Sequence, residues 1–262
     1  MTALLQSVDA HGVATLTLNR PQKRNALDAE LIGLLKEALE ELESRVDVRV
    51  ITIEGSGEYF CAGGDIGSML SVSQSSSSAN EQDALALARM LYALDTASKP
   101  TVALAKGAVV GGGVGLLACC DIVIAADDSS FSLSEVRLGL LPAIVAPFLI
   151  RAIGLRQLRR YALTAERFSA AEAQKLGLVH LVTPKLEIGL AHAAIVSDLL
   201  RGAPGAQADV KAFFAECHGH GVDTGILHEA ASRLAARRSS GEAQEGLRAF
   251  LEKRTPSWTA AD

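Results

Sequence analysis

Two periodicities of apolar residues follow one another along the first part of the chain. Alternating apolar and polar residues predict a strand at residues 13–18, and β-branched residues predict a second strand at 48–53. Between them, apolar residues recur every three or four positions from 27 to 42, opposite a face of lysine and glutamate, which predicts an amphipathic helix capped by Asp28. The order strand, helix, strand indicates the α/β class.

The central part of the chain begins with a serine-rich segment. Residues 68–80 have no period, and we expect an exposed, mobile loop there. Helical spacing returns at 85–92 and ends before Lys99 and Pro100, because the residue before a proline disfavours the helical region. Beyond the proline, the pattern predicts a strand, a short helix and another strand, at residues 101–105, 113–120 and 122–125.

From Pro142 onward the sequence is predicted to be almost entirely helical. Ser169 and Glu172 form a capping-box pattern, and Gly177 is well placed to end the helix that they begin. A short strand is expected at 179–182. The last helices are amphipathic, as a covering layer or a subunit contact requires, and lie near residues 186–200, 206–215, 226–236 and 242–253.

Composition and charge narrow the class of protein. The chain has 262 residues, 49% hydrophobic and 21% charged, so it can bury a sizeable core. The net charge of −5 is scattered, which argues against nucleic acid and favours a small-molecule partner. The most apolar window, residues 108–120, is shorter than the ~20 residues that a membrane span needs. The N-terminus lacks the pattern of a secretory signal, and the four cysteines have no disulfide framework spacing, so we expect a cytoplasmic protein without a membrane partner.

A glycine cluster is the first candidate for chemistry. The glycines at 111, 112, 113 and 115 follow a predicted strand and open a predicted helix. Such a turn allows close approach of a ligand to free backbone N–H groups, which serves phosphate binding or stabilisation of an oxyanion, while close helix packing without a ligand is a third interpretation. The dinucleotide-binding match at residues 113–118 is discounted, because Asp121 cuts the helix short and no acidic residue ends a second strand at the usual distance.

A second small-residue turn, residues 60–66, also follows a strand. Alone it is an ordinary loop in which Asp65 caps a helix. Together with the glycine cluster it acquires a different meaning, because two separate turns can each give one N–H group to one oxygen. An oxyanion hole needs two such donors.

Glu135 is the candidate acid or base. The pattern from Ser132 to Glu135 fits a capping box, so the carboxylate could serve only to cap a helix. Its surroundings in sequence favour catalysis, because apolar neighbours raise the pKa of a carboxyl group toward neutrality. These neighbours are Phe131, Leu133, Val136, Leu138 and Leu140.

Two further patterns give weaker indications of function. The cluster from Cys217 to His220, with His228 and Glu229 nearby, matches no standard zinc spacing, and we expect no metal. No glycine-x-serine-x-glycine motif is present, which weakens a serine hydrolase interpretation.

The motifs together resemble those of the enoyl-CoA hydratase/isomerase (crotonase) family, in the same order. The segments that carry the resemblance are residues 19–27, 60–65, 111–113, 120–121, 140–142 and 167–173, with a weaker similarity at 250–254. The resemblance is strong over about the first 185 residues and implies an α/β fold, a spiral of ββα turns. It implies a core over residues 1–200 that holds the CoA and acyl site, followed by a helical trimerisation region over 201–262.

The resemblance also implies the ligands and the site residues. The substrate is an acyl-CoA thioester, so no separate cofactor is expected, and the assembly is a homotrimer or a dimer of trimers. The thioester oxygen is placed between the N–H groups of Ala62 and Gly112, with Glu135 as the acid/base group. CoA contacts are expected at Lys23, Arg24, Ala26, Ala62, Asp65 and Ile66, and from a neighbouring subunit at Phe250 and Lys253. Acyl contacts are expected at Gly111, Gly115, Leu138, Pro142 and Ala143.

One departure from the family pattern matters. Well-studied hydratases of the family have two catalytic glutamates; the second corresponds to Glu135, but the position of the first is Gly115. A single glutamate is typical of the family's double-bond isomerases. The segments 113–115 and 134–143 nevertheless look similar to bacterial hydratases of branched, glutaconyl-type CoA esters, so hydration by Glu135 alone is the leading hypothesis. Isomerisation is the closest alternative, a non-catalytic acyl-CoA binder comes from another class, and a Rossmann dehydrogenase is a distant option.

Overall fold

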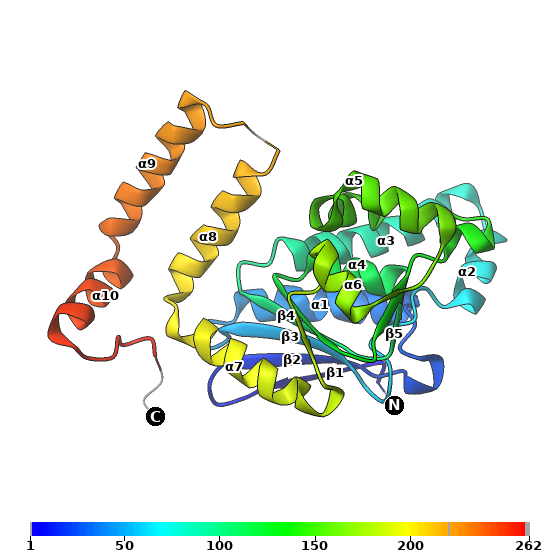
Figure 1. Ribbon diagram of the computed structural model, residues 1–262, viewed down its shortest axis with the longest axis horizontal. Coiled ribbons are helices and arrows are strands. Elements are labelled where there is room, and N and C mark those ends of the chain that lie inside the picture. Colours follow the sequence, from blue (N-terminus) through cyan, green and yellow to red (C-terminus); the bar gives the residue numbers. More distant parts are fainter. Residues whose placement is uncertain (1, 220, 260–262) are drawn as a thin grey trace.

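The computed structural model describes residues 2–219 and 221–259, and its centre is a six-stranded sheet in the order β1-β2-β3-β4-β6-β9 (Figure 1). The first pair, β1 and β2, is antiparallel, and the other neighbours are parallel. The strands are β1 Leu4–Val8, β2 Val13–Leu18, β3 Val50–Gly55, β4 Thr101–Ala105, β6 Ile122–Ala126 and β9 Leu181–Thr183.

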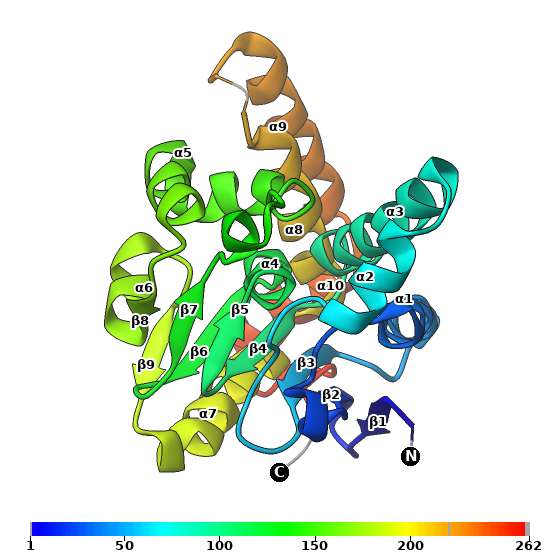
Figure 2. The ribbon, with the colours of Figure 1, turned by 90° about the vertical axis from the view of Figure 1, so that its right-hand side faces the viewer.

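A second, three-stranded sheet has the order β5-β7-β8 and lies beside the first (Figure 2). Its strands are β5 Ala108–Val110, β7 Ser130–Ser132 and β8 Phe168–Ser169. The chain runs from β4 to β5 and into a helix, then from β6 to β7 and into further helices, so that each turn visits both sheets. This confirms the predicted α/β spiral of ββα turns.

Helices cover both faces of the larger sheet, which explains why residues of its inner strands β3 and β4 are buried without alternation. Leu31 and Leu35 belong to the same core cluster as Ile51 and Ile53, whereas Val196 packs in the cluster on the opposite face. The helices of the spiral are α1 Ala29–Ser44, α2 Ile66–Ser73, α3 Ser77–Asp95, α4 Gly112–Cys119, α5 Ala146–Thr164, α6 Ala170–Leu176 and α7 Ile188–Arg201, with 3-10 turns η1 Pro21–Lys23, η2 Glu135–Leu138 and η3 Lys185–Glu187.

Several local predictions are confirmed. Asp28 caps α1 by accepting a hydrogen bond from the Leu31 N–H group, and Ser169 caps α6 through the Glu172 N–H group. Gly177 ends α6 in the left-handed conformation. The predicted elements occur with ends that differ by a few residues, except that the helix expected at 85–92 already begins at Ser77.

The prediction of a loop at residues 68–80 is wrong. The segment belongs to α2 and to the start of α3, separated only by Gln74, Ser75 and Ser76. Two polar side chains start these helices: Asp65 accepts from the N–H groups of Gly67 and Ser68, and Ser76 accepts from that of Ala79. Serine competes poorly inside a helix but is a favoured N-cap, and the composition alone concealed that role.

The remaining helices form an arm that extends from the sheets (Figure 1). They are α8 Pro204–Cys217, α9 Thr224–Arg238 and α10 Gly241–Glu252. At its base, Lys211 Nζ lies 2.6 Å from Asp121 Oδ2, and the Arg49 guanidinium donates to the carbonyl oxygens of Gly202 and Trp258. No helix in the described ranges 2–219 and 221–259 is long and apolar enough to cross a bilayer.

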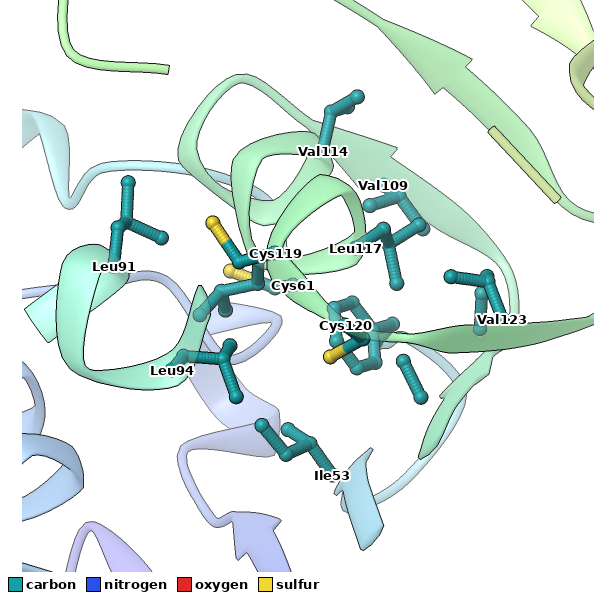
Figure 3. Close-up of a cluster of buried hydrophobic side chains, with 14 of the residues drawn as sticks. Ile53, Cys61, Leu91, Leu94, Val109, Val114, Leu117, Cys119, Cys120 and Val123 are labelled. Carbon is teal, nitrogen blue, oxygen red and sulfur yellow. The ribbon is translucent and has the colours of Figure 1, made fainter. Parts of the chain in front are cut away.

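Three of the four cysteines lie in the core around α4 (Figure 3). Cys61, Cys119 and Cys120 are buried together with Leu91, and Cys217 is half-buried. Burial raises the pKa of the Cys61 thiol to about 12 and also raises those of Cys119 and Cys120. Such thiols are inert at neutral pH, because the thiolate is the reactive form.

We therefore expect about one thiol of the native protein, that of Cys217, to react rapidly with a chromogenic disulfide reagent at neutral pH. All four should react after unfolding. Rapid labelling of two or more thiols in the native state would contradict this packing, and Cys217→Ser identifies the reactive position.

Candidate active site

The start of α4 and Glu135 are in contact. Gly111 caps the helix with φ 49° and ψ −114°, a conformation that glycine adopts readily and other residues rarely do. Its N–H group donates to the Ser132 carbonyl oxygen at 2.9 Å, which joins the turn to the strand preceding Glu135. A Cβ atom at Gly111 would lie 2.7 Å from Glu135 Oε1, so the carboxylate rests directly on the glycine.

Gly112 presents a free donor at this turn. It is the first residue of α4, half-buried, and its N–H group has no hydrogen-bond acceptor within the described residues. The first N–H groups of a helix have no partner inside the helix and carry positive potential, which suits a developing negative charge on an oxygen. Gly112 therefore has the free N–H group that its predicted role as an oxyanion donor needs.

The loop that follows β3 lies against the same turn. The Val110 N–H group donates to the Cys61 carbonyl oxygen at 3.0 Å, and a Cβ atom at Gly63 would lie 2.9 Å from the Val110 carbonyl oxygen. Gly63 has φ 88°, a conformation that residues with a side chain rarely adopt. Because it has no Cβ atom, its backbone can approach that of Val110. The two small-residue turns of the sequence are therefore neighbours in space.

The structure does not support Ala62 as an oxyanion donor. Its N–H group donates to the Arg24 carbonyl oxygen at 3.0 Å and is already paired. In the same loop, the half-buried Gly64 has no acceptor for its N–H group among the described residues. The free donor of this loop is thus two residues further along than the sequence-based prediction placed it.

The carboxyl group of Glu135 is held in an apolar setting. Glu135 begins η2, and its Oε2 atom is buried without a hydrogen-bond partner among the described residues. Burial raises the pKa of Glu135, and the backbone hydrogen bond to the carboxylate offsets only part of that. The capping-box alternative is not observed, because Ser132 ends β7 and Glu135 is itself the first residue of η2, so neither residue stands at the position that a capping box requires.

The expected apolar neighbours of Glu135 divide into two groups. Phe131 and Leu133, which precede Glu135 in the chain, are fully buried. The others lie on the surface beside it and are 37–53% exposed: Val136, Leu138 and Leu140. Within one chain, only Phe131 and Leu133 can therefore help to exclude water from the surroundings of Glu135.

Gly115 lies one helical turn beyond Gly111, where the family pattern has its other glutamate. It is buried, and the space in front of it is filled by Val145. No pattern in the sequence indicates that Val145 packs on α4. Within the described residues, no group of three His, Cys, Asp or Glu side chains is placed to hold a metal ion, and His220 lies outside them.

The loop at residues 23–26, which is predicted to contact CoA, is followed by Leu27, whose N–H group donates to the Gly63 carbonyl oxygen at 2.7 Å. Arg24 is in the left-handed conformation with its guanidinium 5.2 Å from the centre of the Tyr59 ring, and the Ala26 carbonyl accepts a hydrogen bond from Arg20. Lys23 is largely exposed, 3.9 Å from Asp65. A ligand approaching this loop would meet two cations, as a phosphate group requires.

Arg20 joins the two loops and was not among the predicted site residues. Its Nη2 atom lies 2.7 Å from Asp28 Oδ2 and 3.1 Å from Asp65 Oδ2, with all three side chains mostly buried. Hydrogen bonds, first from the Ser68 backbone and then from Arg20, lower the pKa of Asp65. The arginine thereby fixes Asp65, the neighbour of Gly64.

Arg20→Met should destabilise the protein by about 2–4 kcal/mol at neutral pH, because two partly buried carboxylates lose their counter-charge. A lowered pKa gives stability that is present above the unfolded-state pKa and lost as pH falls through the folded-state pKa. The deficit should therefore stay constant down to about pH 4, the ordinary pKa of an aspartate, and narrow as pH falls below it. Denaturant unfolding at several pH values measures it. Arg156→Met, at an exposed arginine, is the control, and equal losses in both variants would contradict the assignment.

The remaining predicted residues are placed as follows. Leu138 follows Glu135 in η2, and Pro142 is half-buried beyond it. Ala143 lines an external groove formed with α1, α3 and α5. Ile66, at the start of α2, is 57% exposed. The CoA residues expected from a neighbouring subunit lie on the arm, away from α4 in Figure 1: Phe250 and Lys253.

Comparison with solved structures shows that this arrangement of two sheets and their covering helices is the crotonase fold. An enoyl-CoA hydratase from Shewanella pealeana superposes with a TM-score of 0.94 at 38% identity, covering 98% of this chain and 96% of that one. The enoyl-CoA hydratase/isomerase family profile matches residues 9–261. The chain therefore belongs to the enoyl-CoA hydratase/isomerase family.

Curated relatives include both activities of the family. A mevalonyl-coenzyme A hydratase of Aspergillus fumigatus is 32% identical over 254 residues, covering 94% of this chain and 91% of its own. A peroxisomal Δ(3,5)-Δ(2,4)-dienoyl-CoA isomerase of Arabidopsis thaliana is 33% identical over 256 residues, covering 92% and 90%. Similarity of this degree leaves the choice between hydration and isomerisation to the site.

Proposed function

We propose that the protein is an enoyl-CoA hydratase that uses Glu135 as its only acid/base group. The observation that carries the proposal is the contact between the Glu135 carboxylate and the backbone of Gly111, next to the free N–H group of Gly112. A proton-transfer group and an oxyanion donor then act on the same acyl group. The proposed substrates are branched, glutaconyl-type enoyl-CoA esters.

The N–H groups of Gly64 and Gly112 would hold the thioester oxygen. Both are half-buried backbone donors without an acceptor in the described chain, on turns that touch through Gly63 and Val110. Negative charge collects on the thioester oxygen when a nucleophile adds to the conjugated double bond. Two fixed donors stabilise that charge more than the neutral ground state, and one such donor is worth ~10²–10³ in kcat.

Glu135 would carry out both proton transfers. Its carboxylate accepts a proton from water as the water oxygen bonds to C3, and the resulting enolate then receives that proton at C2. Water has thereby been added across the double bond, with no net change in the enzyme. The raised pKa of Glu135 brings the group closer to the range in which it can serve as both base and acid.

Isomerisation is the second candidate, and Gly115 is the observation that favours it. With no side chain at 115 and Val145 in its place, no second carboxylate is available there to hold the attacking water. A single base can move a proton from C2 to C4 without water. Hydration remains the leading proposal because a glutaconyl-type substrate brings its own carboxylate, which can orient the water.

A panel of straight, branched and glutaconyl-type enoyl-CoA esters separates the candidates. A hydratase removes the conjugated-thioester absorbance of 2-enoyl esters, whereas an isomerase makes that absorbance rise from 3-enoyl esters. The proposal predicts the first result, strongest with the branched dicarboxylic esters. Tight CoA-ester binding without conversion of any member would instead favour a non-catalytic acyl-CoA binder.

A further inference from the structure

The Val145 side chain occupies the space that a side chain at 115 would need. A Cβ atom at Gly115 would lie 2.3 Å from Val145 Cγ1 and 3.0 Å from Val145 Cβ, closer than van der Waals contact allows. Val145 is only 3% exposed, and a β-branched side chain has few rotamers into which it can turn. A valine at position 145 therefore leaves no room for a side chain at position 115.

This contact lies one helical turn from the proposed base. The Gly115 N–H group donates to the Gly111 carbonyl oxygen at 3.1 Å, and the Glu135 carboxylate rests on Gly111. Positions one turn apart on a helix are about 5–6 Å from each other. Val145 immediately precedes α5, which packs against the η2 turn that contains Glu135. The carboxylate and the valine thus cover adjacent turns of α4.

We propose that Val145 is a specificity-determining residue. Its side chain excludes a second carboxylate at position 115, so that Glu135 is the single carboxylate of the site, and it places an apolar group where the second carboxylate would stand. This proposal rests on the proposed function. The sizes of residues 115 and 145 are therefore coupled: a small residue at 145 would leave room for a side chain at 115. An enlarged residue 115 then reaches the same region as Glu135.

This coupling predicts that the effect of Gly115→Ala on the melting temperature has opposite signs in the wild type and in a Val145→Gly background. Gly115→Ala should lower the melting temperature of the wild type, because its methyl group meets Val145. In a Val145→Gly background the same substitution should raise it, since alanine is a better helix former than glycine and the space is free. Equal effects in both backgrounds would overturn the proposal, and neither comparison depends on activity.

The consequence for specificity is tested by building the second carboxylate. Gly115→Glu combined with Val145→Gly should hydrate the straight-chain ester crotonyl-CoA at least about tenfold faster than Val145→Gly alone, because a second acid/base group contributes ~10²–10⁴ when well placed. The matched control replaces Gly115 with glutamine in the same background, which fills the space without a carboxylate and should give no gain. A folded Glu variant with no more activity than the Gln variant would refute the specificity role.

The two failures are distinguishable. If the wild type converts no enoyl-CoA ester but the Gly115→Ala effect reverses sign, the proposed function fails and the size coupling stands. If the wild type hydrates branched esters and the effect does not reverse, the hydratase proposal survives and the role of Val145 is wrong.

Discussion

Glu135→Gln is expected to reduce kcat for enoyl-CoA hydration by ~10²–10⁴, the usual contribution of a general acid/base group. Glutamine has nearly the same shape and can rest on Gly111 in the same way, but it cannot accept and return a proton. KM should change little, because the thioester oxygen is held by backbone donors. Steady-state kinetics on the best ester of the panel measures both values.

The same substitution should leave the fold intact or stabilise it. Burial raises the pKa of Glu135, so its folded-state pKa lies above its unfolded-state pKa and the ionised form disfavours folding. That cost is absent at pH values below the unfolded-state pKa and appears as pH rises through the folded-state pKa. Glutamine removes the charge, and the melting temperature at neutral pH should therefore equal or exceed that of the wild type.

Activity should also follow the titration of Glu135. Glu135 must be ionised to act as a base, so kcat/KM should fall as the pH drops below the pKa of Glu135. Because burial raises that pKa, the fall should occur above the ordinary glutamate value of about 4.3. Glu187→Gln is a suitable control, since Glu187 also lies in a 3-10 turn but is exposed. If Glu135→Gln and Glu187→Gln had the same small effect on turnover, Glu135 would not be the acid/base group.

The sequence was sufficient to predict structural features that depend on the local backbone. A glycine turn after a strand and before a helix predicts free N–H groups, and Gly112 has one. The apolar residues Phe131 and Leu133 predict burial around Glu135, and the raised pKa agrees. In each case the signal lies within a few residues of the group that it describes.

Pairings between distant segments could not be predicted in the same way. Which N–H group of the 60–66 loop stays free depends on Arg24, which adopts the left-handed conformation and whose carbonyl oxygen accepts from the Ala62 N–H group. The filling of position 115 depends on Val145, thirty residues away in the chain. Periodicity and composition carry no information about such contacts.

Gly111→Ala should have the largest effect on the site among the glycine substitutions. Alanine would place its Cβ atom 2.7 Å from Glu135 Oε1 and would have to adopt φ 49° with ψ −114°. Strain of this kind costs about 1–3 kcal/mol, and relief of it moves either the carboxylate or the turn that presents Gly112. We expect kcat to fall at least tenfold, because a displacement of about 1 Å can cost 10²-fold.

Gly33→Ala is the matched control for that substitution. Gly33 lies inside α1, and a Cβ atom there would have no heavy atom within 4 Å. Alanine should stabilise the helix by about 0.8–1 kcal/mol and leave kcat unchanged. The same change of residue is thus expected to have opposite effects on stability at the two positions. If Gly111→Ala retained wild-type kcat, close contact between the Gly111 turn and Glu135 would not be required for catalysis.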